Sequence, residues 1–183
     1  RVAVFSDNPA PLRPLLESDP RIQTAWFPAR DYQPGHEADV LILDSINPGR
    51  LPVRPALILR PGTASAQLNQ WNATHPVTAN LRSADMRLED VRTLMPEDGD
   101  TVLVSTTAGP AGLARDAPPR RVLLGFHPGS PALRYHVAAP LLFANIVQWL
   151  APSRSQRQET LAAAPGALAV ELPEAAAADP RSQ

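Results

Sequence analysis

The run Asp39-Val-Leu-Ile-Leu-Asp44 constrains what this chain can fold into more than any other part of its sequence. It is apolar between two acids, without polar alternation, which is typical of a parallel-sheet strand whose two faces are both covered. Ala56-Leu-Ile-Leu59 repeats the pattern after a proline-rich loop, and Val2–Ser6 is a similar short strand near the first residue. These runs predict buried strands at the centre of the fold.

Helix patterns alternate with these strands. Pro11–Ser18 carries leucines on one face, and Ala138–Leu150 has a wide apolar stripe with a proline in its first turn. Over Ala64–Trp71, two apolar residues three positions apart predict a short helix. Asp85–Met95 fits either a helix or a strand. Strands that alternate with helices predict an α/β fold, with an open and mostly parallel sheet and helices on both faces.

Two further strands are predicted to form a hairpin. Ala111–Arg115 and Arg121–Phe126 are joined by the five-residue loop Asp116-Ala-Pro-Pro-Arg120, a length that hairpins use. We expect this antiparallel hairpin at one edge of the sheet, since mixed sheets commonly have antiparallel strands there. Ile22–Phe27 and Thr101–Ser105 complete the predicted strands.

A change of composition at Ser153 divides the chain. Residues 1–152 are predicted to form one α/β domain. Residues 153–183, rich in Ala and Pro, are predicted to be a partly disordered tail or the start of a truncated β segment, with one strand at Leu168–Leu172. Because a strand begins almost at Arg1, we interpret the chain as a piece of a longer protein. No stretch of the sequence is long and apolar enough to span a membrane.

Two absent residue types exclude several kinds of chemistry. The sequence has no cysteine, so it offers no disulfide, no thiolate nucleophile and no cysteine-ligated metal. All 17 basic residues are arginine, which excludes a Schiff-base lysine and a phosphate-loop lysine. The net charge of -1 argues against a nucleic-acid surface, which needs a basic face.

Polar residues at the ends of the predicted strands are candidates for a ligand crevice, because open α/β sheets bind ligands beyond the carboxyl ends of their strands. Asp7 and Asp44 lie at the ends of two strands, Ser105 ends a third, and His127 follows a fourth. His75 lies before a proline, in a turn or extended loop. The alternative is that the aspartates cap the next helix or turn, and that His75 only anchors its loop.

Motifs for catalysis and cofactors are weak or missing. Ser105, His127 and Asp44 can be written as a Ser–His–Asp set, but no G-x-S-x-G elbow is present to expose a serine nucleophile. No two histidines have i,i+4 spacing, and no acidic cluster has calcium-loop spacing. Ala108-Gly-Pro-Ala-Gly112 lacks the spacing of a phosphate-binding loop and is predicted to be a turn. We predict no catalytic residue, no metal site and no cofactor.

Several sequence segments, taken in order, resemble those of a known domain. They are residues 39–52 and 56–62, the segment Trp71…His75-Pro-Val-Thr-Ala-Asn-Leu81, the segment 121–126 with 130–134, and the closing Pro140-Leu-Leu-Phe-Ala-Asn-Ile-Val-Gln-Trp-Leu150. Over about residues 1–152 the chain resembles the class I glutamine amidotransferase-like domain of bacterial membrane-anchored proteins of the BatA and von Willebrand factor A (VWA) type. The resemblance implies a flavodoxin-like, amidotransferase-like fold, a parent protein with membrane helices and a VWA domain, and a periplasmic or other extracytoplasmic location.

The chain departs from the amidotransferase pattern at the nucleophile. Those enzymes use a cysteine on a strand-to-helix elbow, with a histidine and a glutamate behind it. The matching elbow here is Arg60-Pro-Gly-Thr-Ala-Ser65, which contains no cysteine, and Ser65 has no flanking glycine. The resemblance therefore implies an inherited fold whose chemistry is lost.

We therefore expect a non-catalytic interaction or scaffold domain of a membrane-anchored protein, which contacts a protein partner or other domains of its parent chain and no nucleic acid. Membrane attachment would come only through flanking segments outside this chain. Two alternatives stay open. One is a small-ligand or carbohydrate-binding domain that uses a crevice around Asp7, Asp44, His75, Ser105 and His127. The other is a hydrolase with an unrecognised serine, for which Ser105 and Ser65 are the positions to test.

Overall fold

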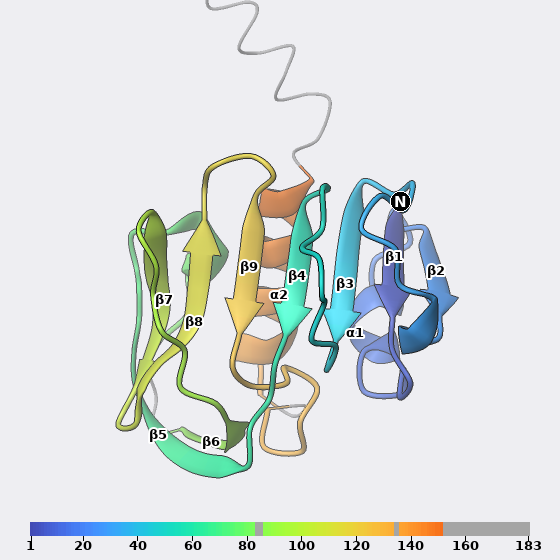
Figure 1. Ribbon diagram of the computed structural model, residues 1–183. Helices are drawn as coiled ribbons and strands as arrows, with labels where there is room; N and C mark the ends of the chain where they lie inside the picture. Colours follow the sequence, from blue (N-terminus) through green and yellow to red (C-terminus); the bar gives the residue numbers. More distant parts are fainter. Residues whose placement is uncertain (83–85, 134–135, 152–183) are drawn as a thin grey trace, which may run out of the picture. The chain divides into compact units, whose positions relative to one another are not determined.

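Figure 1 shows the computed structural model, which describes residues 1–82, 86–133 and 136–151. These residues form one sheet of nine strands in the order β2-β1-β3-β4-β9-β8-β7-β5-β6. The strands are β1 (Val2–Phe5), β2 (Thr24–Phe27), β3 (Val40–Asp44), β4 (Ala56–Leu59), β5 (Ala64–Trp71), β6 (Arg87–Val91), β7 (Asp100–Thr106), β8 (Gly109–Arg115) and β9 (Arg121–Leu124). The helices are α1 (Arg13–Glu17) and α2 (Ala138–Leu150), with 3-10 turns η1 (Ala29–Asp31) and η2 (Pro76–Thr78). The predicted tail 153–183 and its strand lie outside the described residues.

Five strands form the parallel half of the sheet, in the order β2-β1-β3-β4-β9. Their pairings are all parallel, with Ile42 beside Leu57 and Leu57 beside Val122. β1, β3 and β4 are buried along their whole length, which explains their uninterrupted apolar sequences. This order matches that of flavodoxin-like folds, with the fifth strand supplied from late in the chain. The buried strands predicted from the sequence are confirmed.

The other half of the sheet is antiparallel. Strands β9, β8, β7, β5 and β6 pair in that order, so the sheet has four parallel and four antiparallel pairings. The prediction of a mostly parallel sheet is therefore wrong. The predicted hairpin exists as β8 and β9, with Gly112 opposite Leu124, but it lies inside the sheet, where β9 joins the two halves.

Strand β5 occupies Ala64–Trp71, where the sequence pattern predicts a helix. Leu68 and Trp71 are both buried, although regular alternation would place residues three apart on opposite faces. The pairing of β5 with β7 shifts register between Leu68 and Gln70, and such a bulge inserts one residue and brings both side chains to the same face. The spacing of three thus reflects a β-bulge and not a helical turn. The ambiguous stretch 85–95 contains strand β6.

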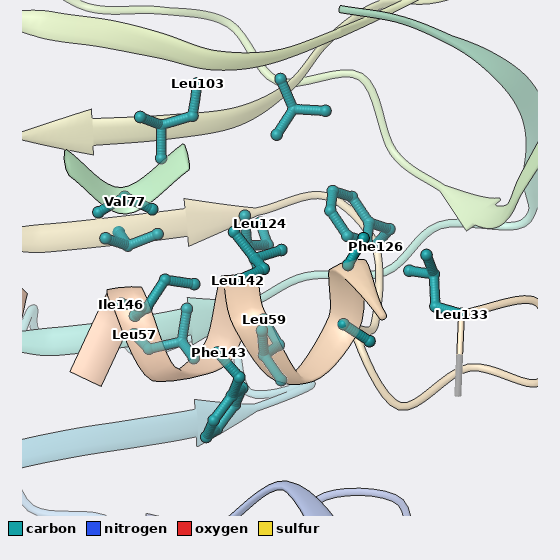
Figure 2. Packing of buried hydrophobic residues seen from close by; sticks show 14 of the residues in the cluster. Leu57, Leu59, Val77, Leu103, Leu124, Phe126, Leu133, Leu142, Phe143 and Ile146 are labelled. Atoms are coloured by element: carbon teal, nitrogen blue, oxygen red, sulfur yellow. The ribbon is translucent and has the colours of Figure 1, made fainter. Parts of the chain in front are cut away.

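Both α-helices pack on the same face of the sheet. In Figure 1, α2 lies behind β4 and β9. Figure 2 shows its side chains packed on those of the strands, with Leu142, Phe143 and Ile146 near Leu57, Leu59 and Leu124. α1 buries Leu16 in the same core, and α2 has the bounds and the apolar stripe that the sequence predicts. The prediction of helices on both faces is wrong. Among the described residues, the connections from β2 to β3 and from β3 to β4 contain no α-helix, and the antiparallel strands β5–β8 stand where a crossover helix between β4 and β9 is expected.

The opposite face of the sheet carries a smaller apolar cluster. Its members are Ala3, Phe5, Leu41, Leu43, Ala56 and Ile58. Over β1 the rings of Phe27 and Tyr32 cover Phe5, with centroids 5.2 Å and 5.5 Å from its ring. Over β4, β9 and β8 this face carries no α-helix among the described residues (Figure 1). Within the same part of the chain, no helix combines the length and the apolar character needed to cross a membrane.

Candidate functional site

Ser6 and Asp44 meet at the carboxyl ends of two neighbouring strands, β1 and β3. Both point to the helix-covered face, because they continue the alternation that buries Val4 and Ile42 there. The Ser6 Oγ donates a hydrogen bond of 2.6 Å to Asp44 Oδ2 and accepts one of 3.0 Å from the Asn8 N–H. Asp44 is only 7% exposed, so protein groups must satisfy its carboxylate.

His127 reaches the same carboxylate from the far side of β4. It follows β9, and its Nε2 lies 3.5 Å from Asp44 Oδ1. Its Nδ1 accepts a hydrogen bond of 3.0 Å from the Gly129 N–H. Gly129 lies in the loop that positions the imidazole, where this loop packs against Pro11, just before α1. A Cβ at this position would lie 2.4 Å from the carbonyl oxygen of Pro11, so a glycine is needed there. The structure thus brings together Asp44 and His127, two of the predicted site residues.

A second hydroxyl completes the contacts of the carboxylate. Ser45 Oγ donates a hydrogen bond of 3.1 Å to Asp44 Oδ1. Ser45 has a φ of 59°, in the left-handed region that is uncommon for residues other than glycine, and this marks a tight turn at the end of β3. We call Ser6, Asp44 and His127 the strand-end clamp, because they join β1, β3 and the segment after β9.

These contacts determine the charge of the clamp. Burial raises the pKa of Asp44, but the contacts of its carboxylate with His127 and with the Ser6 hydroxyl outweigh burial, so the pKa lies below its usual 3.8. Asp44 is therefore ionised at neutral pH. Because Nδ1 of His127 accepts a hydrogen bond, the proton of the neutral ring resides on Nε2, which faces the Asp44 carboxylate.

This arrangement differs from that of a catalytic Ser–His–Asp triad. In a triad, one ring nitrogen contacts the carboxylate and the other accepts the proton of the serine. In this chain the second ring nitrogen of His127 accepts from a backbone N–H, and the single proton of Ser6 is donated to Asp44. No lone pair of the imidazole is left to act as a general base. The geometry suits a structural link between strand ends.

Asp7 does not join the clamp. Its Oδ1 accepts a hydrogen bond of 3.0 Å from the N–H of Ala29, the first residue of η1. Successive side chains of a strand point to opposite faces, so the neighbour of Ser6 is directed away from Asp44. This contact is of the kind that the capping alternative predicts, with an aspartate satisfying a backbone N–H.

His75 lies at the opposite end of the sheet from the clamp. Its ring packs edge-on against Trp149 in the last turn of α2, with 5.2 Å between ring centroids. Arg120, directly before β9, donates a hydrogen bond of 3.0 Å to the Trp149 carbonyl oxygen, whereas His127 follows the end of β9. The two histidines are therefore separated by the length of this strand.

The surroundings of His75 favour its neutral form. Its Nδ1 accepts a hydrogen bond of 3.2 Å from the Val77 N–H, and its Nε2 is buried without a hydrogen-bond partner among the described residues. Burial lowers the pKa of His75 below 6.5, against an opposing effect of Asp116, and Arg120 lowers it further. These contacts agree with the alternative in which His75 anchors its loop.

The two candidate serines lie away from His127. Ser105 is on β7, opposite Pro110 and two strands from β9. Ser65 is exposed on β5, and the segment 60–65 leads from β4 into this strand, where an amidotransferase elbow would lead into a helix. The described residues contain no group of three or more His, Asp or Glu side chains with the geometry of a metal site.

Two contacts of Asp44 were not predicted from the sequence. The contact of Ser6 could have been predicted from strand alternation. Val2, Val4 and Ser6 point to one face of β1, the face that Asp44 shares, and Asp7 points to the other. Ser45 carries no such signal, because its position depends on a left-handed turn that the sequence Asp-Ser-Ile does not indicate.

No family model matches this chain, and no curated protein matches its sequence. Solved structures do share its fold. A Thermoplasma acidophilum protein, provisionally described as one of the GMP synthase subunits, has a TM-score of 0.57 at 13% identity, covering 87% of this chain and 96% of its own. Two Salmonella typhimurium proteins have TM-scores of 0.64 and 0.59 at 10% and 9% identity, covering 82% of this chain and 100% and 98% of theirs. The fold is amidotransferase-like.

These similarities correct one expectation. Both Salmonella proteins are described as cytoplasmic, which contradicts the expected extracytoplasmic location. That expectation rested on the implied parent protein and not on any residue of this chain, so it is not retained. At 9% to 13% identity, no activity or substrate of the similar structures is carried over to this chain.

Proposed function

We propose that this chain is a non-catalytic domain of amidotransferase-like fold that binds a protein partner or another domain of its parent chain. The strand-end clamp carries this proposal. At the sheet edge where α/β enzymes hold their reacting groups, the side-chain oxygens and nitrogens of Ser6, Asp44 and His127 all have partners within the protein. The sequence also has no cysteine, the nucleophile that the resemblance implies.

The clamp suits a domain whose role is to present a surface. It links β1, β3 and the segment after β9, so the parallel strands are joined by side chains at the edge where their backbone pairing ends. A buried, ionised carboxylate destabilises the folded state unless its hydrogen bonds and ionic contacts are kept. The same groups could therefore not be released to a substrate without destabilising the domain.

A hydrolase screen tests this proposal, with glutamine as an amide substrate and p-nitrophenyl acetate as an ester substrate. We expect the wild-type chain and the variants Ser105→Ala, Ser65→Ala and His127→Gln to show no more than the buffer rate. Circular dichroism confirms that each variant is folded. Turnover by the wild-type chain that any of the three substitutions abolishes would refute the proposal. Turnover that survives all three would refute it as well and would point to other residues.

The small-ligand or carbohydrate alternative has less support, because the carboxylates of Asp7 and Asp44 are engaged by Ala29 and by the clamp. A thermal-shift screen with sugars and divalent cations distinguishes the two. We expect no change in Tm. A dose-dependent rise in Tm that Asp44→Asn removes would favour the crevice.

From the resemblance of residues 1–152 alone, we also propose that the parent protein is of the BatA or VWA type. The reading frame around the coding segment tests this. A VWA domain encoded on its N-terminal side would support the assignment, and a free-standing frame that begins near Arg1 would contradict it.

A further inference from the structure

The sheet face opposite the helices carries a groove with a volume of about 250 Å³. Its floor is formed by three adjacent strands, with Ile58 on β4, Leu123 on β9 and Leu113 on β8. The loop after β3 forms one wall with Leu51, and the segment after β6 forms the other with Met95. Leu51 is 52% exposed and Met95 is 89% exposed, so both walls present apolar surface to solvent.

Two arginines of this groove have no acidic partner. Three arginines and two acids line it, and Arg115 accounts for both acids, at 2.8 Å from Asp100 and 3.0 Å from Glu97. Arg60 and Arg121 form no ion pair with any described residue, and the Nε of Arg121 is buried without a hydrogen-bond partner there. A buried donor without an acceptor costs free energy. A carboxylate that binds at this site therefore gains more binding free energy than one that binds an exposed guanidinium.

The two unpaired arginines are spaced along the strands. Arg121 pairs with Ala56 in the register of β4 and β9, and Arg60 lies four residues beyond Ala56. At about 3.3 Å per residue, their Cα atoms are about 13 Å apart along the strand direction. Ile58 and Leu123 lie between them. In an extended peptide, residues i and i+4 have this same separation and point to the same side, with residue i+2 between them.

We propose that this groove binds an extended segment of a partner protein that carries two acidic residues four positions apart, with an apolar residue midway. The two carboxylates contact Arg60 and Arg121, and the apolar side chain lies on Ile58 and Leu123. This inference rests on the proposed interaction function and supplies its site and the chemistry of its partner. The groove volume is below the roughly 300–1,000 Å³ of pockets that enclose a whole small ligand, which suits one or two side chains of a longer chain.

Charge disfavours a second copy of this chain as the occupant. In a two-fold dimer the same patch faces itself. Arg60 and Arg121 would then approach the same two side chains of the other copy, without added acids to neutralise them. An acidic segment of a different protein meets both arginines with opposite charge.

The test is a titration of a fluorescent Glu-Ala-Leu-Ala-Glu peptide, blocked at both ends, with the full chain, followed by anisotropy. We expect saturable binding that weakens as salt is added, and no binding of the matched Lys-Ala-Leu-Ala-Lys peptide. Arg60→Ala and Arg121→Ala should each weaken binding roughly tenfold. Arg82→Ala, an exposed arginine outside the groove, should leave binding unchanged. Met95→Glu, at a position too exposed to matter for folding, places a carboxylate on one wall and should weaken binding.

Absence of saturable binding, or binding that Arg60→Ala and Arg121→Ala leave unchanged, would overturn the inference. Sedimentation that shows a dimer, dissociated by Met95→Glu, would also overturn it by assigning the groove to a second copy. None of these results bears on catalysis. The proposed non-catalytic function is tested separately, by turnover in the hydrolase screen and by the thermal-shift screen, which use the same protein preparation.

Discussion

The imidazole of His127 reaches the carboxylate of Asp44 across the end of β4, with 3.5 Å between Nε2 and Oδ1. β4 lies between β3, which ends in Asp44, and β9, which His127 follows. Ser6 adds β1 to the same carboxylate. The carboxyl ends of the parallel strands are thus joined by side chains as well as by backbone hydrogen bonds, and Asp44 is the residue common to every contact.

Replacing Asp44 with Asn should lower the free energy of unfolding by about 1–3 kcal/mol. The amide keeps the size of the carboxylate but has one acceptor oxygen in place of two, so it cannot accept from Ser6, Ser45 and His127 together. Urea unfolding followed by circular dichroism measures the loss. Asp98→Asn, at an exposed loop position, should change stability by less than about 0.5 kcal/mol. Equal losses in the two variants would show that the clamp adds nothing.

Acid should destabilise the wild-type chain more than Asp44→Asn. The pKa of Asp44 is lowered in the folded state, so its stabilisation is fully present above the unfolded value of 3.8 and is lost as the pH falls through the lower folded value. The hydrogen bond from Arg21 lowers the pKa of Asp19 to about 2, but this pair is present in both proteins and cancels. Unfolding free energies measured from about pH 6 to about pH 2 should converge for the two proteins. Curves that stay parallel would contradict this role of Asp44.

A fall from about pH 7.5 to about pH 5.5 should lower Tm through His75. Burial lowers the pKa of His75 in the folded state, so the unfolded chain takes up the proton first. The stabilisation is therefore present above the unfolded value of 6.5 and is lost as the pH falls below it. The physical cause is local, because protonation of Nδ1 would break its hydrogen bond from the Val77 N–H.

The variant His75→Asn isolates this effect. An asparagine oxygen can still accept from the Val77 N–H, but the ring that packs on Trp149 is lost. We expect a lower Tm at pH 7.5 and a weaker dependence of Tm on pH, both measured by scanning fluorimetry. Gln70→Ala, at an exposed position that carries no titrating group, is the control and should keep the wild-type pH dependence. If both variants keep it, the effect does not come from His75.

Gly129→Ala should cost more than about 1 kcal/mol of stability. A Cβ at this position would lie 2.4 Å from the Pro11 carbonyl oxygen, and neither backbone can move without displacing the loop that positions His127. Gly49→Ala is a matched control, since its Cβ would meet nothing within 4 Å. It should be neutral or stabilise by up to about 1 kcal/mol. Thermal unfolding compares the two, and equal changes would remove the steric explanation.

The parallel core and α2 can be predicted from local sequence. A strand covered on both faces must be apolar throughout, which is why Asp39–Asp44 and Ala56–Leu59 predict β3 and β4 to within one residue. A long helix on one face of a sheet shows an apolar stripe with helical spacing, and Ala138–Leu150 is α2 as predicted. The strand β5 is not readable in this way, because its bulge gives Leu68 and Trp71 a helical spacing.

Local sequence predicts that Asp44 ends a buried strand and that His127 follows another, because a polar residue directly after an apolar run is a local signal. It does not predict that these two residues meet, that His75 lies at the far end of β9, or that Arg60 and Arg121 flank an uncovered groove. Each of these facts depends on strand order and on the face that a segment crosses. Strand order and the choice of face both depend on packing between segments that are distant in the chain. A local sequence pattern does not indicate the free energy of that packing.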